Sequence, residues 1–577
     1  MDECRLSTNV FKLVWDAWEN HSQKNPKGEA IIHWDVITGS FRWTYGNLWE
    51  SALKVADYLI KNGVAKGDIC ALMIRHNMYF YPIYMGVSLI GAIPAVLAHP
   101  NARLHPDKFI NGLVGMAQKS GLDWILTEHE LGPIIKPIIT ELKVSIKGIF
   151  YPLECLKDWQ SIEPDSSSIK ESRSGIDENM PFLLQHSSGT TGLQKAVVLS
   201  HRAVLEHVKR YSEAIKLCEK DKIISWLPLY HDMGLIAAFH LPLIYGIPLV
   251  LIDPLQWVVA PRIFFYAISE EKCTLTWLPN FAYNFMADRV LDKDMENIRL
   301  DSMRMFINCS EVVRAQSHDK FFHRFKEYGV KKQSLAACYA MAETTFAVTQ
   351  TTPGLEASSV AVSRDALSRQ MVEIKANENL AKICVSSGKP ISGCAVKITD
   401  ENGKELSEDR IGRIIINSVS LFDGYRNDLQ RTRHVLKDGW YSSGDLGFCH
   451  GGEYFVVGRE DDVIIIAGNN IYPEDIEDAA SKVSGVIPGR AVAFGVDNEQ
   501  LGTQDICVVV ETPIENESEK ESLKLALMQA GMSIDVTISQ IHLVPPRWLI
   551  KSSSGKPSRR ANRERILSGK LQEDAKP

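Results

Sequence analysis

The sequence has no clustered cysteines. Its eleven cysteines are scattered singly from Cys4 to Cys507, with no C-x-x-C pair and no cluster of cysteine and histidine. This spacing argues against a zinc site and is typical of reduced thiols, so we expect a cytoplasmic protein. An excess of positive charge is also missing. The formal net charge is -7 at pH 7, which argues against a general nucleic-acid-binding protein.

Long uninterrupted apolar segments are scarce. The first residues, MDECRLSTNVFKL, lack the apolar core of a signal peptide. One charge-free run, residues 78–98, is long enough to cross a bilayer, but two prolines and two glycines interrupt it. We interpret it as a buried helix over 82–90, a turn at Gly91 and a buried strand over 93–97. We therefore expect no membrane span.

Apolar strands alternate with amphipathic helices over most of the chain. Strand-like runs include DICALMI (68–74), CTLTWLP (273–279) and RMFINCS (304–310), and a second helix–glycine–strand unit covers 237–254. Such units predict parallel sheets that are covered on both faces. From about Ser387 the sequence becomes β-rich and punctuated by glycine, which predicts an antiparallel or barrel-like subdomain.

The length of 577 residues exceeds what one ordinary core supports, so we expect more than one domain. The predicted fold class is α/β, with a large N-terminal domain of βα-layered sheets over 1–460. Its β-rich subdomain covers about 387–460. A small, mobile α+β domain follows over 461–577.

The segment QHSSGTTGLQK, residues 185–195, concentrates hydroxyl groups and glycines before a lysine. A buried-strand pattern, PFLLQ, precedes it, and the following strand ends at Ser200, a predicted helix N-cap. Glycines let the backbone turn its N–H groups inward, while the hydroxyl groups and Lys195 add further donors. This pattern favours a cradle for phosphate oxygens, with a flexible hairpin turn as the alternative. It is not a Walker loop, because Gln194 precedes the lysine.

The loop resembles the phosphate loop of the adenylate-forming superfamily, which includes acyl-CoA synthetases and fatty acyl-AMP ligases. Six further stretches resemble that family in the expected order. They are WLPLYHDMGL (226–235), INCSEVV (307–313), CYAMAETT (338–345), WYSSGDLG (440–447), GREDDVIIIAGNNIYPEDIE (458–477) and SSSGKPSRR (552–560). The details are closest to fatty acyl-AMP ligases, with acyl-CoA synthetases next.

The resemblance implies ATP-dependent activation of a carboxylic acid to an acyl-AMP, with ATP and Mg²⁺ as cofactors. It assigns nucleotide binding to Ser187, Ser188, Gly189, Thr190, Thr191, Gly192, Ser310, Glu311, Cys338, Tyr339, Ala340, Met341, Ala342, Thr344, Asp445 and Arg459. Tyr339 would face adenine, while Asp445 and Arg459 would bind the ribose. Glu343 would bind Mg²⁺, and Asp461 would be a hinge.

Four residues are implied to act in catalysis: Lys556, His231, Lys195 and Thr190. Lys556 would bridge the acyl and phosphate oxygens, and His231 would gate the acyl pocket. The proposed acyl pocket comprises Trp226, His231, Met233, Trp277, Asn280, Phe281 and Cys309. Ordinary core positions remain an alternative for Trp226, Met233, Trp277 and Phe281.

The chain departs from the fatty acyl-AMP ligase pattern near that pocket. Cys309 stands where the pattern has a glycine, and the larger side chain would narrow the acyl cavity. We therefore expect an unusual, shorter or aromatic acid. Residues 355–385 are helix-capable and long for a simple connection. In the family, an insertion in this region is thought to hinder the CoA-bound conformation; a variable surface loop is the alternative.

Three functional hypotheses follow. In the first, the chain transfers the acyl group to the phosphopantetheine thiol of an acyl carrier protein, in lipid or polyketide biosynthesis. In the second, it is a stand-alone acyl- or aryl-CoA ligase. In the third, it is a non-catalytic acyl- or nucleotide-binding module. The basic C-terminal end, which includes Lys551 and Arg560, would meet an acidic carrier helix or a CoA phosphate, or is simply solvated.

Overall fold

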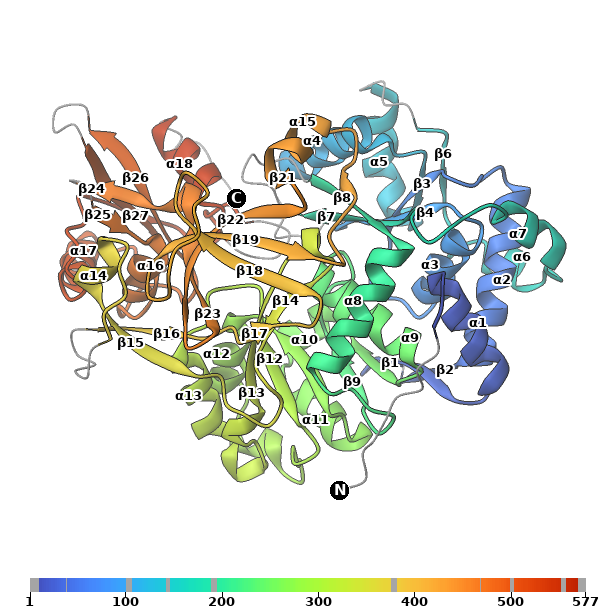
Figure 1. Cartoon of the computed structure of the whole chain (residues 1–577), viewed down its shortest axis with the longest axis horizontal. Coiled ribbons are helices and arrows are strands. Elements are labelled where there is room, and N and C mark those ends of the chain that lie inside the picture. Colours follow the sequence, from blue (N-terminus) through green and yellow to red (C-terminus); the bar gives the residue numbers. More distant parts are fainter. Residues whose placement is uncertain are drawn as a thin grey trace.

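The computed structural model describes residues 10–37, 39–99, 106–141, 146–187, 195–374, 381–466, 469–498, 503–551 and 557–568. Two large sheets and their helices fill one side of the molecule, and a smaller α+β part lies at the other (Figure 1). None of the helices in these ranges is long and apolar enough to cross a membrane. The run 78–98 instead forms helix α3 (Phe80–Leu89) and strand β4 (Ile93–Val96), as predicted.

A seven-stranded sheet comes mainly from the N-terminal third. Its order is β20 (Gly424–Tyr425), β8 (Lys195–Ser200), β7 (Pro181–Ser187), β4, β3 (Ile69–Met73), β5 (Trp124–Thr127) and β6 (Gly148–Phe150). From β7 to β6 the strands are parallel, whereas β8 and β20 are antiparallel to their neighbours. The antiparallel β7–β8 pair brings Ser187 opposite Lys195 at the mouth of the hydroxyl–glycine loop.

The interior of this sheet is covered on both faces. In β3, Cys70 and Leu72 pack into the main core, while Ile69, Ala71 and Met73 pack into a second core. Helices α4 (Pro106–Met116) and α5 (Gly132–Glu141) cover the second face. A strand that is buried on both sides reads as a continuous apolar run, which is why residues 68–74 predicted it correctly.

The second large sheet has nine strands. Its order is β17 (Lys389–Pro390), β14 (Ala347–Gln350), β13 (Leu335–Ala340), β12 (Met305–Asn308), β11 (Leu275–Leu278), β9 (Ile223–Ser225), β10 (Leu249–Ile252), β1 (Glu29–Trp34) and β2 (Phe41–Thr44). The strands from β13 to β1 are parallel. The two helix–glycine–strand units predicted from sequence therefore belong to different sheets, with β4 in one and β10 in the other.

Helices link the two sheets into one core. They include α1 (Val14–Lys24), α2 (Tyr45–Lys61), α3, α8 (His201–Ala214) and α9 (Leu241–Tyr245). Helices α11 (Arg262–Glu271), α12 (Asn280–Arg289) and α13 (Ala315–Phe325) also bury residues in the main core. Their rings pack closely: the centroid of the Phe321 ring lies 4.9 Å from that of Phe325 and 5.3 Å from that of Phe306 in β12.

The β-rich segment forms an antiparallel five-stranded sheet, as its glycine-punctuated sequence predicted. Its strands are β18 (Cys394–Thr399), β19 (Gly412–Ser418), β21 (Leu436–Lys437), β22 (Trp440–His450) and β23 (Glu453–Arg459). The last residue of β23, Arg459, stands opposite Asp445 of β22.

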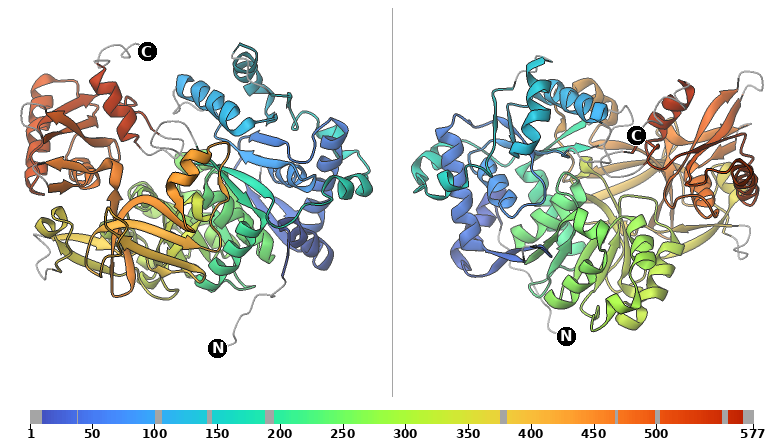
Figure 2. Two further views of the ribbon diagram at one scale, coloured as in Figure 1. Left: turned by 45° about the horizontal axis from the view of Figure 1, so that its top comes forward. Right: turned by 180° about the vertical axis from the view of Figure 1, so that it is seen from behind.

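The C-terminal part has cores of its own and stands apart in the left view of Figure 2. Strands β26 (Ala491–Asn498), β27 (Thr503–Glu511) and β28 (Gln540–Val544) form its three-stranded sheet. Helices α16 (Pro473–Ser481) and α17 (Glu517–Met532) cover one face, and α18 (Arg559–Leu567) covers the other. The α+β composition matches the prediction, while the boundary at 460/461 stays a prediction.

The described residues of 355–385 form more strand than helix, unlike the helix-capable expectation. Strands β15 (Ser359–Ser363) and β16 (Ala381–Val385) form an antiparallel pair, and helix α14 (Arg364–Ser368) is a single short turn. Val362 and Cys384 are buried beside Phe448 of β22. Tertiary packing against the β-rich sheet therefore overrides the local helical preference.

Gly388 lies where the nine-stranded and five-stranded sheets meet. Its φ is +89°, and a Cβ there would lie 2.1 Å from the carbonyl carbon of Gln350. Gly403 has a similar φ of +81°, but a Cβ there meets nothing within 4 Å. The two positions separate backbone strain from steric overlap.

We predict that Gly388→Ala lowers the free energy of unfolding by about 1–3 kcal/mol more than Gly403→Ala, because it adds overpacking to the same φ strain. Urea denaturation followed by tryptophan fluorescence measures both variants. Equal losses in the two would show that the close approach to Gln350 is relieved without cost.

Candidate active site

A cleft opens at the carboxyl edge of the nine-stranded sheet, with a cavity volume of about 2810 Å³. Neighbouring strands deliver its residues in order: Asp253 follows β10, Trp226 follows β9, Asn280 follows β11, Cys309 follows β12, and Tyr339 lies near the end of β13. In open parallel sheets, ligands bind at this edge, because the strand ends converge there. The β-rich sheet and the C-terminal part form the remaining walls.

Lys195 and Glu343 meet at one end of the cleft. Lys195 begins β8 of the seven-stranded sheet, and Glu343 lies in a tight turn between β13 and β14 of the other sheet. The Lys195 Nζ is 3.9 Å from Glu343 Oε1. The hydroxyl of Tyr425, from β20, donates to the same oxygen at 2.7 Å. The arrangement offers a fixed positive charge beside a carboxylate that keeps lone pairs for a cation.

Burial lowers the pKa of Lys195, because the ammonium group loses water, while the Glu343 carboxylate partly opposes this shift. The same ammonium lies 5.2 Å from the ring centre of Tyr425. Tyr425 was missed from the sequence, since a tyrosine in the glycine turn FDGYRND carries no sign of a partner some eighty positions away.

Tyr339, Asp445 and Arg459 lie together and bind one another. The Tyr339 hydroxyl donates to Asp445 Oδ2 at 2.6 Å, and Arg459 Nε lies 3.2 Å from Asp445 Oδ1. Burial and the adjacent carboxylate raise the pKa of Tyr339. A carboxylate accepts about four hydrogen bonds, so Asp445 retains capacity for two vicinal hydroxyl groups.

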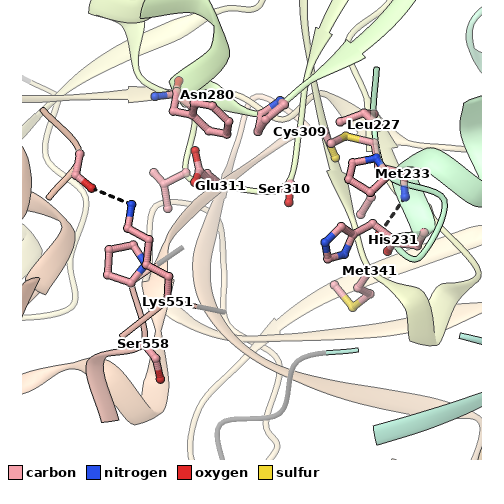
Figure 3. Close-up of a pocket in the computed structure, with 18 of the residues that line it drawn as sticks. Leu227, His231, Met233, Asn280, Cys309, Ser310, Glu311, Met341, Lys551 and Ser558 are labelled. Carbon is pink, nitrogen blue, oxygen red and sulfur yellow. Dashed lines mark hydrogen bonds between the residues drawn. The ribbon is translucent and has the colours of Figure 1, made fainter. Parts of the chain in front are cut away.

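Several other predicted nucleotide residues line the same cleft. They are Ser310, Glu311, Cys338, Ala340, Met341 and Ala342. Ser310 has a φ of +81°, so the chain turns sharply just after β12. Figure 3 shows Ser310 and Glu311 between His231 and Met341 on one side and Lys551 and Ser558 of the C-terminal part on the other.

Aromatic rings form the far wall of the cleft. The Trp226 and Trp257 rings stack with centroids 3.6 Å apart and an interplanar angle of 5°. Phe281 lies edge-on to both, and Phe285 lies 5.2 Å from Trp257. Trp257 and Phe285 were missed. Trp257 lies five residues after the end of β10. Its position shortly after a predicted parallel strand was the sequence feature that could have placed it at the edge of the sheet.

His231, Met233, Asn280 and Cys309 also line this part of the cleft (Figure 3). Cys309 is 1% exposed. The Asn280 side chain is engaged in structure: its amide nitrogen donates to Ser317 at 3.1 Å, and its oxygen accepts from Asn308 and from the backbone of Arg314. Asn280 therefore fixes the floor of the cleft.

Two predicted residues lie elsewhere. Trp277 is fully buried behind the wall, where its indole N–H donates to the Tyr211 hydroxyl at 2.7 Å, so it does not line the cleft. A strand residue directed into the core cannot reach the edge. Thr344 is also fully buried, and its hydroxyl donates to the backbone oxygens of Met341 and Phe346. It shapes the turn that carries Glu343.

Most of the hydroxyl–glycine loop and the lysine predicted to act in catalysis fall outside the described residues. These are Ser188, Gly189, Thr190, Thr191, Gly192 and Lys556. The backbone of Ser187 ends β7, and Lys195 begins β8. Ser200 caps α8 as predicted, because its hydroxyl accepts from Ala203 N at 3.3 Å.

The family of AMP-binding enzymes matches residues 18–426. The chain belongs to this family. A probable long-chain-fatty-acid–AMP ligase of Mycobacterium tuberculosis, FadD30, is 27% identical over 95% of this chain and 97% of its own length. JamA of Moorena producens, a medium-chain-fatty-acid–[acyl-carrier-protein] ligase, is 26% identical over 92% of this chain and 90% of its own length.

Solved structures show the same fold. One from a study of fatty acyl-adenylate ligases of E. coli and L. pneumophila has a TM-score of 0.88 at 24% identity, covering 98% of this chain and 99% of that one. The fatty acyl-adenylate ligase of L. pneumophila in complex with acyl adenylate and pyrophosphate has a TM-score of 0.73 at 25% identity, covering 98% of each chain.

In this AMP-binding enzyme, one arginine and three carboxylates form a charge cluster in the chain beyond Arg459. The Arg559 guanidinium, at the start of α18, lies 2.7 Å from Asp462, 2.8 Å from Glu474 and 2.7 Å from Glu477. Asp462 is the neighbour of Asp461, the predicted hinge, and both line the cleft. Burial raises the pKa of Glu474, partly opposed by Arg559. One cation thus joins the segment after Arg459 to α16 and α18.

The shifted pKa of Lys195 predicts an early alkaline limit for ATP use. As the pH rises through the lowered pKa, the ammonium loses its charge and attracts phosphate less, so kcat/KM for ATP falls at a lower pH than an exposed lysine would give. Lys195→Arg, whose guanidinium stays charged, should move this alkaline fall in kcat/KM to higher pH. If the fall stays at the same pH, a group other than Lys195 causes it.

Arg559 and Arg560 form a matched pair for testing the charge cluster. Arg559→Ala leaves three carboxylates without their shared cation. We expect it to cost about 3–5 kcal/mol of stability in the C-terminal part. Arg560→Ala should cost under about 1 kcal/mol of stability, because the Arg560 side chain is 57% exposed and pairs only with Glu564 in the described residues. Thermal unfolding measures both, and similar losses would remove the special role of Arg559.

Proposed function

We propose that the chain activates a carboxylic acid with ATP, releases pyrophosphate, and transfers the acyl group to the phosphopantetheine thiol of an acyl carrier protein. One observation carries the proposal: Lys195 and Glu343 meet at 3.9 Å in the same cleft that holds the Tyr339–Asp445–Arg459 cluster and the aromatic wall. The cleft thus holds groups for phosphate, for a metal, for a nucleoside and for an apolar acid.

In the first step, a carboxylate oxygen attacks the α-phosphorus of ATP, and the bond from that phosphorus to the β-phosphate oxygen breaks, with the electron pair leaving on pyrophosphate. The carboxylate is already ionised at neutral pH, so no general base is needed. Positive charge and oriented donors stabilise the developing charge. Lys195 supplies such a charge. By family resemblance, the loop around Thr190 supplies further donors and Lys556 supplies a second positive charge.

The residues present fit a magnesium ion held mainly by the substrate. The described residues contain no group of three or more histidine, cysteine or acidic side chains arranged as a metal site. Mg²⁺ is commonly held by one or two carboxylates together with substrate phosphates and water. Glu343 offers such a carboxylate beside Lys195. When bound, the ion would neutralise phosphate charge.

In the second step, the sulfur of a thiol bonds to the acyl carbonyl carbon, and the bond from that carbon to the phosphate oxygen breaks. AMP leaves with the electron pair, and the thiol proton passes to solvent. The carrier-protein acceptor is supported by the relative JamA, described as a fatty-acid–[acyl-carrier-protein] ligase. Arg547, Lys551, Arg560 and Arg563 line the C-terminal side of the cleft, where an acidic partner would approach. We further propose that residues 461–577 turn about Asp461 between the two steps.

The proposed activity is tested by incubating the protein with ATP, Mg²⁺ and a panel of carboxylic acids while pyrophosphate release is followed. CoA and a phosphopantetheinylated carrier protein are added separately. We expect release with the acid, faster turnover with the carrier than with CoA, and loss of release in Lys556→Ala with ATP binding retained. Preference for CoA would make the chain a CoA ligase, and normal release in Lys556→Ala would contradict the role of that lysine.

Glu343→Gln should weaken the magnesium response severely, raising the Mg²⁺ concentration for half-maximal rate at least about tenfold, since a charged ligand is replaced by a neutral one. Glu271 is a matched control: it is 7% exposed against 6% for Glu343, but it pairs with Arg42 and Lys222 outside the cleft. An unchanged response in Glu343→Gln would move the metal elsewhere.

A further inference from the structure

Three adjacent strands build an aromatic wall, which we define as Trp226, Trp257 and Phe281. Trp226 directly follows β9, Trp257 lies in helix α10 (Pro254–Val259) after β10, and Phe281 lies in the first turn of α12 after β11. Strands β10, β9 and β11 are neighbours in the nine-stranded sheet. The three rings therefore meet at one stretch of the carboxyl edge, carried by regular elements.

The aromatic wall is preformed, with two parallel rings and a third ring edge-on to them. The two indoles stack at 3.6 Å, and Phe281 meets them at 6.3 and 6.2 Å with interplanar angles of 66° and 67°. Within the described residues neither indole N–H of the pair has a hydrogen-bond acceptor, so ring contact holds the stack. With Trp257 fully buried and Trp226 5% exposed, the pair acts as a rigid backing.

Phe281 is the most exposed member of the wall. Its side chain is 45% exposed although it lines the cleft. An apolar ring left open inside a concave site marks a surface for an apolar ligand. A flat ring gains from offset or edge-to-face contact with it, about 2- to 12-fold in affinity beyond the area that it buries, and a methylene chain of equal area lacks this gain.

The position of the wall limits the reach of the acid. Phe281 follows β11, whereas Tyr339, the predicted adenine platform, lies on β13, two strand spacings or about 10 Å away. Cys309 directly follows the intervening strand, β12, and lies at the same end of the cleft as Asn280 (Figure 3). The Asn280 amide is engaged with Ser317 and Asn308, so it presents a fixed floor. This separation fits a ring joined to its carboxylate by a short chain.

We propose that the acid activated in this cleft is an arylalkanoic acid, with its ring on Phe281 and its carboxylate toward the nucleotide. The assignment rests on the proposed adenylating function, because that function sets where the carboxylate points. Phe281 is then the residue that sets specificity, and the stacked indoles hold its surroundings in place.

The test compares two acids of equal carbon number, 4-phenylbutanoate and decanoate. Pyrophosphate release gives kcat/KM for each acid, and calorimetry without ATP gives binding. The wild-type protein should favour the aryl acid about 2- to 12-fold, and Phe281→Ala should remove most of that preference through KM. Phe41→Ala is the control, because Phe41 is 40% exposed on strand β2 and lies outside the cleft.

The outcomes separate the two proposals. A preference for decanoate, or an equal loss for both acids in Phe281→Ala, would overturn the arylalkanoic assignment while leaving adenylation intact. Binding of 4-phenylbutanoate that Phe281→Ala weakens, with no pyrophosphate release for any acid, would support the aryl wall and contradict the proposed adenylation. A loss of preference in Phe41→Ala as well would show that the effect does not come from the cleft.

Discussion

A buried pair of opposite charges joins the ends of the two large sheets. Lys195 comes from the seven-stranded sheet and Glu343 from the nine-stranded sheet, and Tyr425 of β20 holds the carboxylate from the first side. The backbone positions of both residues are therefore set by the two sheets. The proposed phosphate and metal groups therefore keep a fixed spacing in a site of low dielectric, where charge acts more strongly than in water.

The parallel topology places the other parts of the site in a row. Successive strand ends present Trp226, Asn280, Cys309 and Tyr339, so an apolar acid and a nucleotide would lie side by side along one edge. The β-rich sheet then adds Asp445 and Arg459 from the opposite side. The chain after Arg459 leads into the Arg559 cluster, which ties the first residues beyond the predicted hinge to α16 and α18.

Much of this arrangement was predictable from sequence. Continuous apolar runs predicted strands β3, β11 and β12 correctly. The ordered motifs predicted the family, and the comparisons confirm it. Prediction failed where long-range packing decides. Residues 359–363 and 381–385 pair as strands because the β-rich sheet covers them, and Trp277 lies in the core because of its strand register. Trp257 and Tyr425 depend on contacts between distant segments, which a local pattern does not contain. The domain boundary and the individual site roles remain predictions.

A crystal structure with an unreactive ATP analogue and Mg²⁺ tests the central claim most directly. We predict phosphate oxygens within hydrogen-bond distance of Lys195, a metal ion on Glu343, adenine against Tyr339, and ribose hydroxyls on Asp445. A nucleotide bound elsewhere in the molecule, with no metal ion on Glu343, would contradict the account.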